Sequence, residues 1–410
     1  MELKSGYKQT EVGVIPSDWV VKSLGELGRF KNGINKSAED FGYGYPLVNL
    51  LDVFGVSKLK ANGSDFGLVN SNDSERRAYE LKRGDVLFVR SSVKPEGVGL
   101  TTLIHDDLPD AVFSGFLLRF RDGGELVTEY KEHCFFQEGF RRSLIANSTV
   151  SANTNVNQNA LKKLYIWFPP EKSEQSAIAE ALSDVDALLS GLDKLIAKKR
   201  DLKQAAMQQL LTGKTRLPGF SGEWEVNRFG EFVSIRNQKV MPTQVEPETL
   251  CVELEHVGQG DGRLLARGGA SSSSASKYRF RAGDVLFGRL RSYLRKYWCA
   301  SEDGICTTEI WPLMFDKERV SAGFVFALVQ TDNFIEAASV SYGTHMPRAD
   351  WGVIRNFEVA LPSIEEQAAV AEVLSDMDAE LAALEARREK TRLLKQGMMQ
   401  ELLTGKTRLV

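Results

Sequence analysis

Two short stretches of the chain gather side chains that can bind a nucleic acid. Each begins with a nearly identical sequence, GDVLFVR at 84–90 and GDVLFGR at 283–289, which is typical of a turn followed by a buried strand that ends in an arginine. Arginine can bond guanine edges or phosphates, serine can bond phosphates, and tyrosine can bond or stack. From charge alone, an ordinary basic surface loop remains the alternative. The residues concerned are Arg90, Ser91, Ser92 and Lys94 in the first stretch, and Arg289, Arg291, Ser292, Tyr293, Arg295 and Lys296 in the second.

A polar loop follows later in each half of the chain. The sequence STVSANTNVNQN at 148–159 aligns with SYGTHMPR at 341–348. Asparagine and glutamine can pair with adenine in the major groove, so these loops are candidate base readers. A flexible surface linker, rich in turn-forming residues, is the alternative interpretation. The candidate residues are Asn153, Asn155 and Asn157 in the first loop, and Thr344, His345 and Arg348 in the second.

The sequence contains no catalytic or metal centre that we can identify. The Gly-Lys-Thr triplets at 213–215 and 405–407 lack the glycine that a phosphate-binding loop needs five residues earlier, where Gln208 and Gln400 stand. The four cysteines and four histidines are scattered without metal-ligand spacing, and we expect the cysteines to be reduced. No methyltransferase, dinucleotide-binding or nuclease signature is found. We therefore expect a protein that is not an enzyme and that holds neither metal nor cofactor.

Length and composition set wider limits. At 410 residues the chain exceeds the usual size of one hydrophobic core, which predicts two or three domains. No apolar run reaches the eighteen residues of a membrane helix, and the N-terminus is polar, so we expect a cytoplasmic protein without a membrane span. The net charge of −3 gives no overall attraction to nucleic acid. DNA binding would therefore depend on local basic patches or on a basic partner.

The chain contains an internal repeat. Residues 174–217 recur 192 residues later at 366–409 without a gap. Roughly 60% of the paired positions are identical, including all of the closing LLTGKTRL, which excludes chance similarity. The parts between these segments repeat loosely, since PSDW at 16–19 parallels SGEW at 221–224. Their scaffolds should match while their loops differ.

Each strongly repeated segment is predicted to form one long helix. About forty residues pass without proline, which at 1.5 Å per residue gives a helix about 60 Å long. Pro169, Pro170 and Pro362 mark the starts, and Gly213 and Gly405 stand where a left-handed cap belongs. One apolar stripe needs a mate, either the other copy running antiparallel or the helices of a partner. The stripe comprises Ile178, Leu182, Val185 and Leu189 in the first copy, and Val370, Leu374, Met377 and Leu381 in the second.

In their order and duplication, these motifs resemble the specificity subunits of type I restriction-modification enzymes. The resemblance covers nearly the whole chain, through the two GDVLF motifs, YIWFPPEKSEQSAIA at 165–179, FEVALPSIEEQAAVA at 357–371 and the LLTGKTRL endings. It implies an α+β protein in which two long antiparallel coiled-coil helices separate two pseudo-symmetric globular α/β target-recognition domains. The domains are then 1–168 and 213–360, and the helices 169–212 and 361–405.

The resemblance also implies function and partners. A specificity subunit reads a bipartite site on double-stranded DNA, and two unlike domains imply an asymmetric site. It assembles with two methyltransferase subunits and with motor-nuclease subunits, on which S-adenosylmethionine, ATP and Mg are expected. Two alternatives stay open: the recognition subunit of a bipartite type IIB enzyme, and a coiled-coil scaffold with two protein-binding domains.

The predicted helices generate a first test. Adjacent major grooves on one face of DNA lie roughly 34 Å apart, so helices of fixed length should set the spacing between the half-sites. We expect insertion of one helical turn into both helices to lengthen the spacer and to leave the bases of both half-sites unchanged. Methylation sequencing reads both quantities, and altered half-site bases would contradict the prediction.

Overall fold

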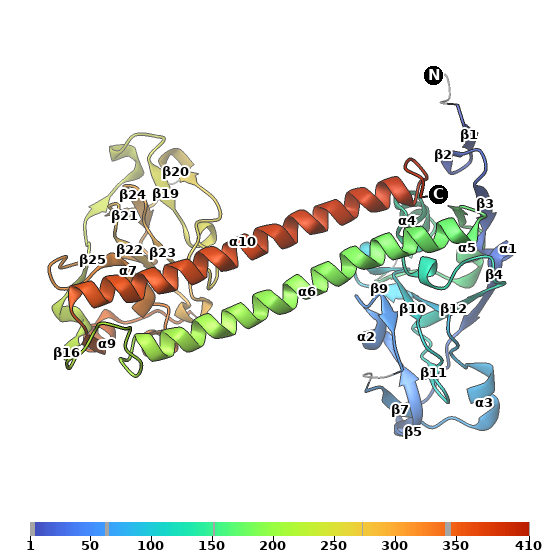
Figure 1. Ribbon diagram of the computed structural model, residues 1–410, viewed down its shortest axis with the longest axis horizontal. Helices are drawn as coiled ribbons and strands as arrows, with labels where there is room; N and C mark the ends of the chain where they lie inside the picture. The colour runs from blue at the N-terminus through green and yellow to red at the C-terminus, as the bar shows by residue number, and fades with distance from the viewer. Residues whose placement is uncertain (1–4, 62–64, 151, 273, 341–345, 410) are drawn as a thin grey trace. The chain divides into compact units, whose positions relative to one another are not determined.

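The computed structural model describes residues 5–61, 65–150, 152–272, 274–340 and 346–409. The chain divides into two compact units (Figure 1). Unit 1 comprises Met1–Leu192 with Arg387–Val410, and unit 2 comprises Asp193–Ala386. Each unit mixes strands and helices, as the α+β prediction requires. From the sequence, the long helices were expected to be separate from the two domains. In the structure, each unit contains one end of each long helix.

Unit 1 is organised around a five-stranded sheet in the order β4-β12-β8-β10-β6. These strands are β4 (Gly28–Asn32), β12 (Leu117–Asp122), β8 (Val86–Val89), β10 (Thr101–Ile104) and β6 (Lys58–Leu59). The smaller sheets contain β11 (Val112–Phe113), β5 (Phe41–Val48) and β7 (Gly67–Val69); β13 (Thr149–Val150), β14 (Thr154–Asn155) and β9 (Ser91–Ser92); β15 (Tyr165–Phe168) and β3 (Val20–Ser23); and β1 (Tyr7–Thr10) and β2 (Gly13–Pro16). The helices besides the long ones are α1 (Leu24–Leu27), α2 (Leu50–Val53), α3 (Asp73–Ala78), α4 (Glu138–Ala146) and α5 (Gln158–Lys162).

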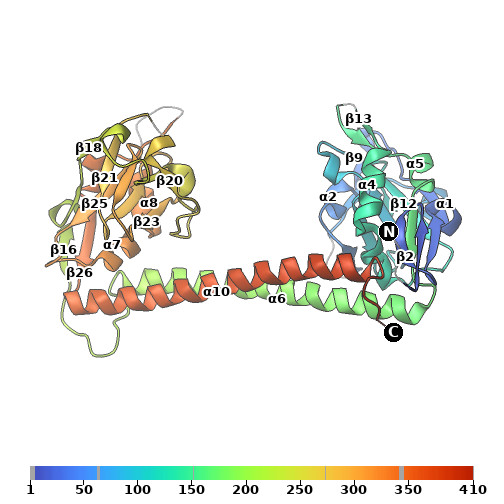
Figure 2. The same cartoon turned by 90° about the horizontal axis from the view of Figure 1, so that it is seen from above.

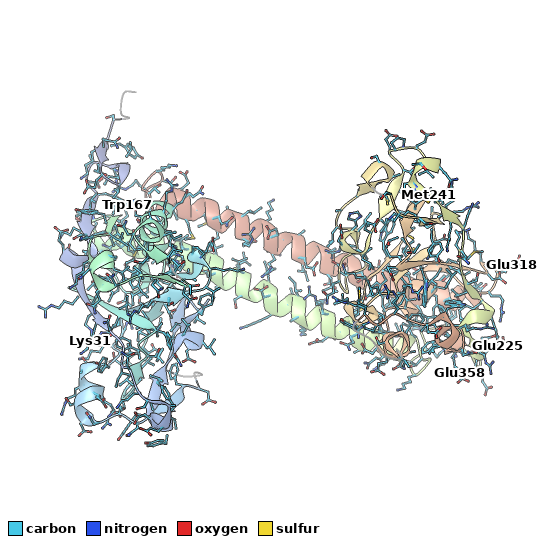
Figure 3. The ribbon with its side chains drawn as sticks, turned by 180° about the vertical axis from the view of Figure 1, so that it is seen from behind. Lys31, Trp167, Glu225, Met241, Glu318 and Glu358 are labelled. Atoms are coloured by element: carbon cyan, nitrogen blue, oxygen red, sulfur yellow. The ribbon has the colours of Figure 1, made fainter. Side chains whose placement is uncertain are left out.

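Unit 2 repeats the central arrangement with a four-stranded sheet in the order β17-β25-β22-β23. These strands are β17 (Val233–Ile235), β25 (Ile310–Phe315), β22 (Val285–Gly288) and β23 (Tyr297–Cys299). The other strands are β18 (Lys239–Val240), β21 (Lys277–Phe280), β24 (Gly304–Thr307), β19 (Leu250–Val252) and β20 (Gly268–Gly269), which form a second sheet, and the pair β16 (Glu225–Arg228) and β26 (Glu358–Leu361). The short helices are α7 (Ala322–Leu328), α8 (Asp332–Ser339) and α9 (Trp351–Ile354). Figure 3 labels Glu225 and Glu358 on the paired strands of unit 2, and Lys31 on β4 of unit 1.

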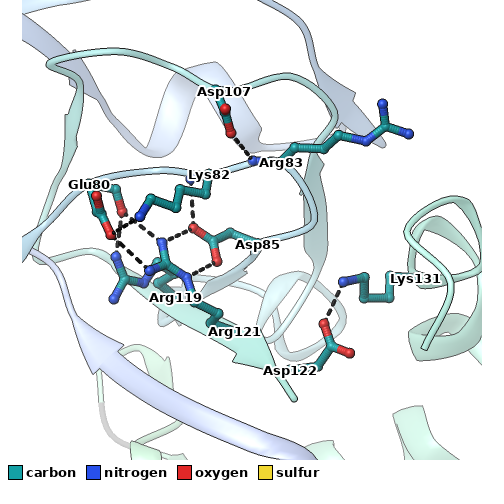
Figure 4. A network of polar contacts seen from close by, with 9 residues as sticks. All are labelled: Glu80, Lys82, Arg83, Asp85, Asp107, Arg119, Arg121, Asp122 and Lys131. Atoms are coloured by element: carbon teal, nitrogen blue, oxygen red, sulfur yellow. Dashed lines mark hydrogen bonds and ion pairs between the residues drawn. The ribbon is translucent and has the colours of Figure 1, made fainter. Parts of the chain in front are cut away.

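The two GDVLF motifs occupy the same place in the two units. Each supplies a glycine with positive φ, Gly84 at 86° and Gly283 at 89°, followed by the buried strands β8 and β22. The aspartate of each motif is buried and accepts a backbone N–H from within its own turn. An arginine pairs with each: Arg121 of β12 lies 2.6 Å from Asp85 (Figure 4), and Arg236 lies 2.7 Å from Asp284. These ion pairs compensate the buried carboxylate charge and fix the turn that starts the central strand.

Each strongly repeated segment forms one long helix, as predicted. These are α6 (Lys172–Leu210) and α10 (Ile364–Leu402), each of 39 residues. Gly213 and Gly405 follow them with φ of 68° and 72°, which confirms the left-handed caps. In unit 1, Lys395 lies 2.6 Å from Asp186, and in unit 2, Lys203 of α6 lies 2.6 Å from Asp378 of α10. Within the described residues, no helix is long and apolar enough to cross a membrane.

The apolar stripe of the helices packs largely inside the units. Ile178 and Leu182 belong to the main core of unit 1, which also contains Leu403 just past the end of α10. In unit 2, Val370 and Leu374 lie in the core together with the end of α6. The main exceptions are Val185, Leu189 and Met377, which are partly exposed, while Leu381 is buried. The prediction that this stripe receives partner helices is therefore wrong for the four core residues, because the globular bodies already cover them.

Two ion pairs close the units in the same way. Arg408 donates to both carboxylate oxygens of Glu174, at 2.5 and 2.8 Å, and also to Asp18. Arg216 donates to both oxygens of Glu366, at 2.5 and 2.6 Å. Each arginine follows the end of one long helix, and each glutamate lies in the first turn of the other. These pairs therefore join the end of one helix to the start of the other, which requires an antiparallel arrangement in each unit.

A buried glutamine follows each of these glutamates. Gln175 accepts the N–H of Val127 at 2.7 Å and donates to the carbonyls of Glu125 and Pro169 at 3.1 and 2.9 Å. Gln367 makes the equivalent three bonds in unit 2, with the backbone of Ser321, Arg319 and Pro362. A single fully buried side chain therefore satisfies three backbone groups in each unit.

This arrangement predicts a local loss of stability on substitution. We expect Gln175→Leu to lower the opening free energy of unit 1 by at least about 3 kcal/mol, because three backbone groups lose their partner and each unpaired buried group costs about 1–3 kcal/mol. Hydrogen exchange measured by mass spectrometry should show lost protection in β15 and the first turns of α6, with unit 2 unchanged. Gln367→Leu should do the reverse, and Ser176→Ala, at an exposed neighbouring position, is the control. Equal loss in both units would contradict the prediction.

Candidate nucleic-acid interface

The structure brings together the two groups of residues that the sequence treated as separate. β8 leads to Arg90 and β22 leads to Arg289, and both arginines are fixed through their backbone. The carbonyl of Arg90 accepts the N–H of Val156 at 2.9 Å, and that of Arg289 accepts the N–H of Ala349 at 2.8 Å. The basic stretch and the later polar loop therefore form one surface in each unit. We call them surface 1 (residues 90–94 and 153–157) and surface 2 (residues 289–296 and 346–350).

Surface 1 is a small polar sheet. Ser91 pairs with Asn155 and Ser92 pairs with Thr154, which aligns β9 antiparallel to β14. Figure 2 shows β9, β13 and α2 on the same side of unit 1. Both serines and Asn155 are half-buried, so part of each side chain reaches the solvent. The sheet thus holds hydroxyl and amide groups on a rigid backbone, as base recognition requires.

The other predicted residues of surface 1 differ in their surroundings. Asn153 and Lys94 are exposed. Arg90 is half-buried, and its guanidinium donates to the carbonyl of Gly115 at 3.3 Å. The side-chain oxygen of Asn157 accepts the N–H of Ala160, so Asn157 is the N-cap of α5. A structural role therefore accounts for that oxygen without DNA.

Surface 2 is built from charged side chains. Leu290 bridges to Arg348, and the N–H of Arg291 donates to the carbonyl of Pro347 at 2.8 Å. Arg291 and Tyr293 are exposed, and Arg291 has a φ of 51°, which non-glycine residues rarely adopt. The backbone therefore holds this arginine in a turn at the surface of the unit.

Arg348 belongs to the same surface and is held by a carboxylate. It donates to both oxygens of Glu309, at 2.8 to 3.1 Å, and this pairing lowers the pKa of Glu309 and raises that of Arg348. A guanidinium fixed on one edge presents its remaining donors in a defined direction. Glu309 was not predicted from the sequence, because it belongs to none of the motifs and lies 39 residues before Arg348.

Three predicted residues of surface 2 make internal contacts instead. Ser292 is buried and donates to the carbonyl of Ala338 at 2.8 Å. Lys296 donates to two backbone carbonyls, at 2.6 and 2.9 Å, and Arg295 pairs with Asp332. These contacts fold the loop, so the prediction of DNA contact is wrong for buried Ser292 and is not supported for the other two. The remaining predicted residues, Thr344 and His345, lie outside the described residues.

Among the described residues, no three or more histidine, cysteine, aspartate or glutamate side chains form a group that could hold a metal ion. The four cysteines are free thiols, and burial raises the pKa of Cys134 and Cys306. What the structure offers at its two surfaces is therefore a set of hydrogen-bond donors and acceptors on rigid backbone.

Comparison with known proteins identifies this arrangement. A family model described as the type I restriction modification DNA specificity domain matches residues 16–199. Similarity to type I specificity subunits extends along nearly the whole chain. Two relatives are specificity subunits of Methanocaldococcus jannaschii type I enzymes: that of MjaVIII is 22% identical over 96% of this chain and 94% of its own, and the putative MjaX subunit is 25% identical over 99% and 97%. The EcoDI specificity subunit of Escherichia coli is 23% identical over 42% of this chain and 37% of its own.

Solved structures of type I systems share the fold. The S subunit of the M. genitalium type I system is 14% identical, with a TM-score of 0.58 over 98% of both chains. A chain from a study of complex assembly and conformational transition of the type I system is 15% identical, with a TM-score of 0.56 over 96% of this chain and 99% of its own. The fold of this chain is thus found in chains of type I restriction-modification systems whose sequences differ widely from it.

Surface 2 generates a prediction that separates binding from folding. We expect Arg291→Ala to cost about 1–3 kcal/mol of discrimination at one half-site only, as loss of an arginine–base contact does. Its thermal stability should be unchanged, because the side chain is exposed. Arg289→Ala is the matched comparison: its guanidinium lies 5.3 Å from the ring centre of buried Trp311, so it should lower the melting temperature of unit 2.

Binding to DNA libraries randomised in one half-site at a time, together with thermal melting, measures both effects. Equal loss of preference at both half-sites for Arg291→Ala would show that the arginine contacts phosphate non-specifically or acts through folding. A lower melting temperature for this variant would contradict its assignment to an exposed surface.

Proposed function

We propose that this chain reads a bipartite, asymmetric DNA sequence as the specificity subunit of a type I restriction-modification complex. One observation carries the proposal: the two surfaces share a backbone framework but present different side chains. The bonds that fix Arg90 and Arg289 are equivalent, and they place Asn155 of surface 1 where Arg348 stands in surface 2. One scaffold with two different readers recognises two different half-sites.

The side chains suggest what each surface prefers. Surface 2 offers Arg291 and Arg348, and arginine is the residue that most often bonds guanine O6 and N7. Surface 1 offers serine and asparagine, and asparagine pairs with adenine N6 and N7. The two half-sites should therefore differ in base composition, with guanine more prominent in that of unit 2.

The long helices are the proposed docking sites for methyltransferase subunits. Their exposed leucines include Leu188, Leu393 and Leu394 in unit 1, and Leu195 and Leu202 in unit 2. These apolar side chains lie outside the cores and would be covered by a partner. Double-stranded DNA and motor-nuclease subunits complete the proposed assembly, with S-adenosylmethionine, ATP and Mg belonging to the other subunits.

The net charge supports this division of labour. At −3 the chain as a whole is not attracted to DNA, whereas attraction to phosphates supplies most of the non-specific affinity of DNA-binding proteins. Several cations near the surfaces are already engaged within the protein, such as Arg348 by Glu309 and Arg295 by Asp332. We therefore assign sequence choice to this chain and much of the affinity to its partners.

Methylation sequencing of cells that express the complete set of subunits tests the proposal. We expect a single new methylated motif made of two unlike half-sites with a fixed spacer, present only when this chain is expressed. The same cells without this chain are the control. No new motif, or one continuous palindrome, would contradict the proposed function.

A further inference from the structure

Surface 1 borders a hollow that none of the motifs predicted. This cavity of about 540 Å³ in unit 1 is lined by apolar side chains and by residues of surface 1 itself. The apolar lining includes Phe54, Val93 and Phe116, and the polar lining includes Ser92, Lys94, Glu96 and Asn153. We call it the apolar hollow.

The apolar side chains of the hollow are unusually open to solvent. Val93 is 82% exposed, Phe116 57% and Phe54 48%. Single exposed hydrophobic residues are common on protein surfaces, but a group of them lining one depression marks a binding site. They come from three separate parts of the chain, so folding alone gathers them at one place.

Backbone contacts fix the hollow to the residues that are proposed to read bases. The carbonyl of Phe116 accepts the N–H of Arg90 at 2.9 Å. A Cβ atom added at Gly97 would lie 2.3 Å from the hydroxyl of Ser92 and 3.2 Å from the ring of Phe54. The turn after β9 therefore packs tightly between the small sheet and this phenylalanine, with no space for a side chain.

The equivalent position in unit 2 has the opposite chemistry. There the N–H of Arg289 donates to the carbonyl of Glu309, as that of Arg90 does to Phe116. Glu309 holds Arg348, whereas Phe116 faces an apolar depression. The same scaffold position thus carries a phenyl ring in unit 1 and an ion pair in unit 2. At this position the two units can select different chemical groups.

We propose that the apolar hollow contacts the C5-methyl group of thymine in the half-site read by unit 1. The inference rests on the proposed function and deepens it. The thymine methyl is the apolar group that unmodified base pairs display in the major groove, while the other base-edge groups there are hydrogen-bond donors and acceptors. An apolar hollow beside serine and asparagine side chains therefore matches a T·A pair, the methyl in the hollow and the adenine edge toward the amides.

Replacing thymine by deoxyuridine tests this contact, because it removes only the methyl group. The complex with methyltransferase is measured on its recognised duplex with one thymine at a time replaced. The half-site altered by Arg291→Ala belongs to unit 2, which assigns the other to unit 1. We expect at least one deoxyuridine in the half-site of unit 1 to weaken binding about three- to fivefold, the value of burying one methyl group.

Variants of the hollow complete the test. Phe116→Ala should abolish the difference between thymine and deoxyuridine duplexes, and Val93→Ser should reduce it if Phe116→Ala does not fold. Phe41→Ala, at an exposed phenylalanine of β5 outside the lining, is the control and should keep the full difference.

Three results would overturn the proposal. These are a half-site of unit 1 without any T·A pair, equal binding of every deoxyuridine duplex, and weaker binding of Phe116→Ala to all DNA with the deoxyuridine effect retained. The last would make the ring a wedge between bases instead of a methyl reader. In each of these cases the unaltered protein still binds DNA sequence-specifically, whereas absence of any specific binding by the unaltered protein would refute the proposed function and this inference together.

Discussion

The architecture depends on one interaction, the pairing of an arginine after each long helix with a glutamate at the start of the other. Glu174 and Glu366 are each 2% exposed, so their charges need a partner inside the protein. Arg408 and Arg216 supply it with two bonds each. A buried ion pair adds little net stability compared with apolar packing, but breaking one is costly, so it selects one arrangement over others. A shifted register would leave a carboxylate buried and unpaired.

This constraint explains why the repeat is so uneven. One part of the repeat fixes the positions of the long helices, which we call the frame. It comprises the helices themselves, the arginines that follow them and the buried glutamines, and it matches without gaps. The loops around Arg90 and Arg289 need only the shared backbone bonds to Val156 and Ala349. Their exposed side chains make no contribution to the frame. They are therefore free to differ between the two units. Asn155 and Arg348, which occupy equivalent positions, are an example.

The sequence predicts the frame better than the surfaces, for a physical reason. Helix ends depend on local chemistry, and Gly213 and Gly405 were identified from spacing alone because only the adjacent chain decides the need for positive φ. The sequence did not distinguish burial of Ile178 in a globular core from burial in a coiled coil. An apolar stripe indicates that one face of a helix is covered, but it does not indicate what covers that face. Loop side chains such as Ser292 depend on distant carbonyls, which no local pattern reveals.

The apolar hollow could be found only from the structure. Phe54, Val93 and Phe116 carry no common motif, and each alone reads as a core residue. Only the fold shows that they are open to solvent and that they border the candidate base readers. Attraction to phosphates cannot select the site, since it is the same for every sequence. The protein must rely on contacts that differ between base pairs. Apolar contact with a methyl group is such a contact, and it is independent of salt, so specificity is retained whatever affinity the partner subunits supply.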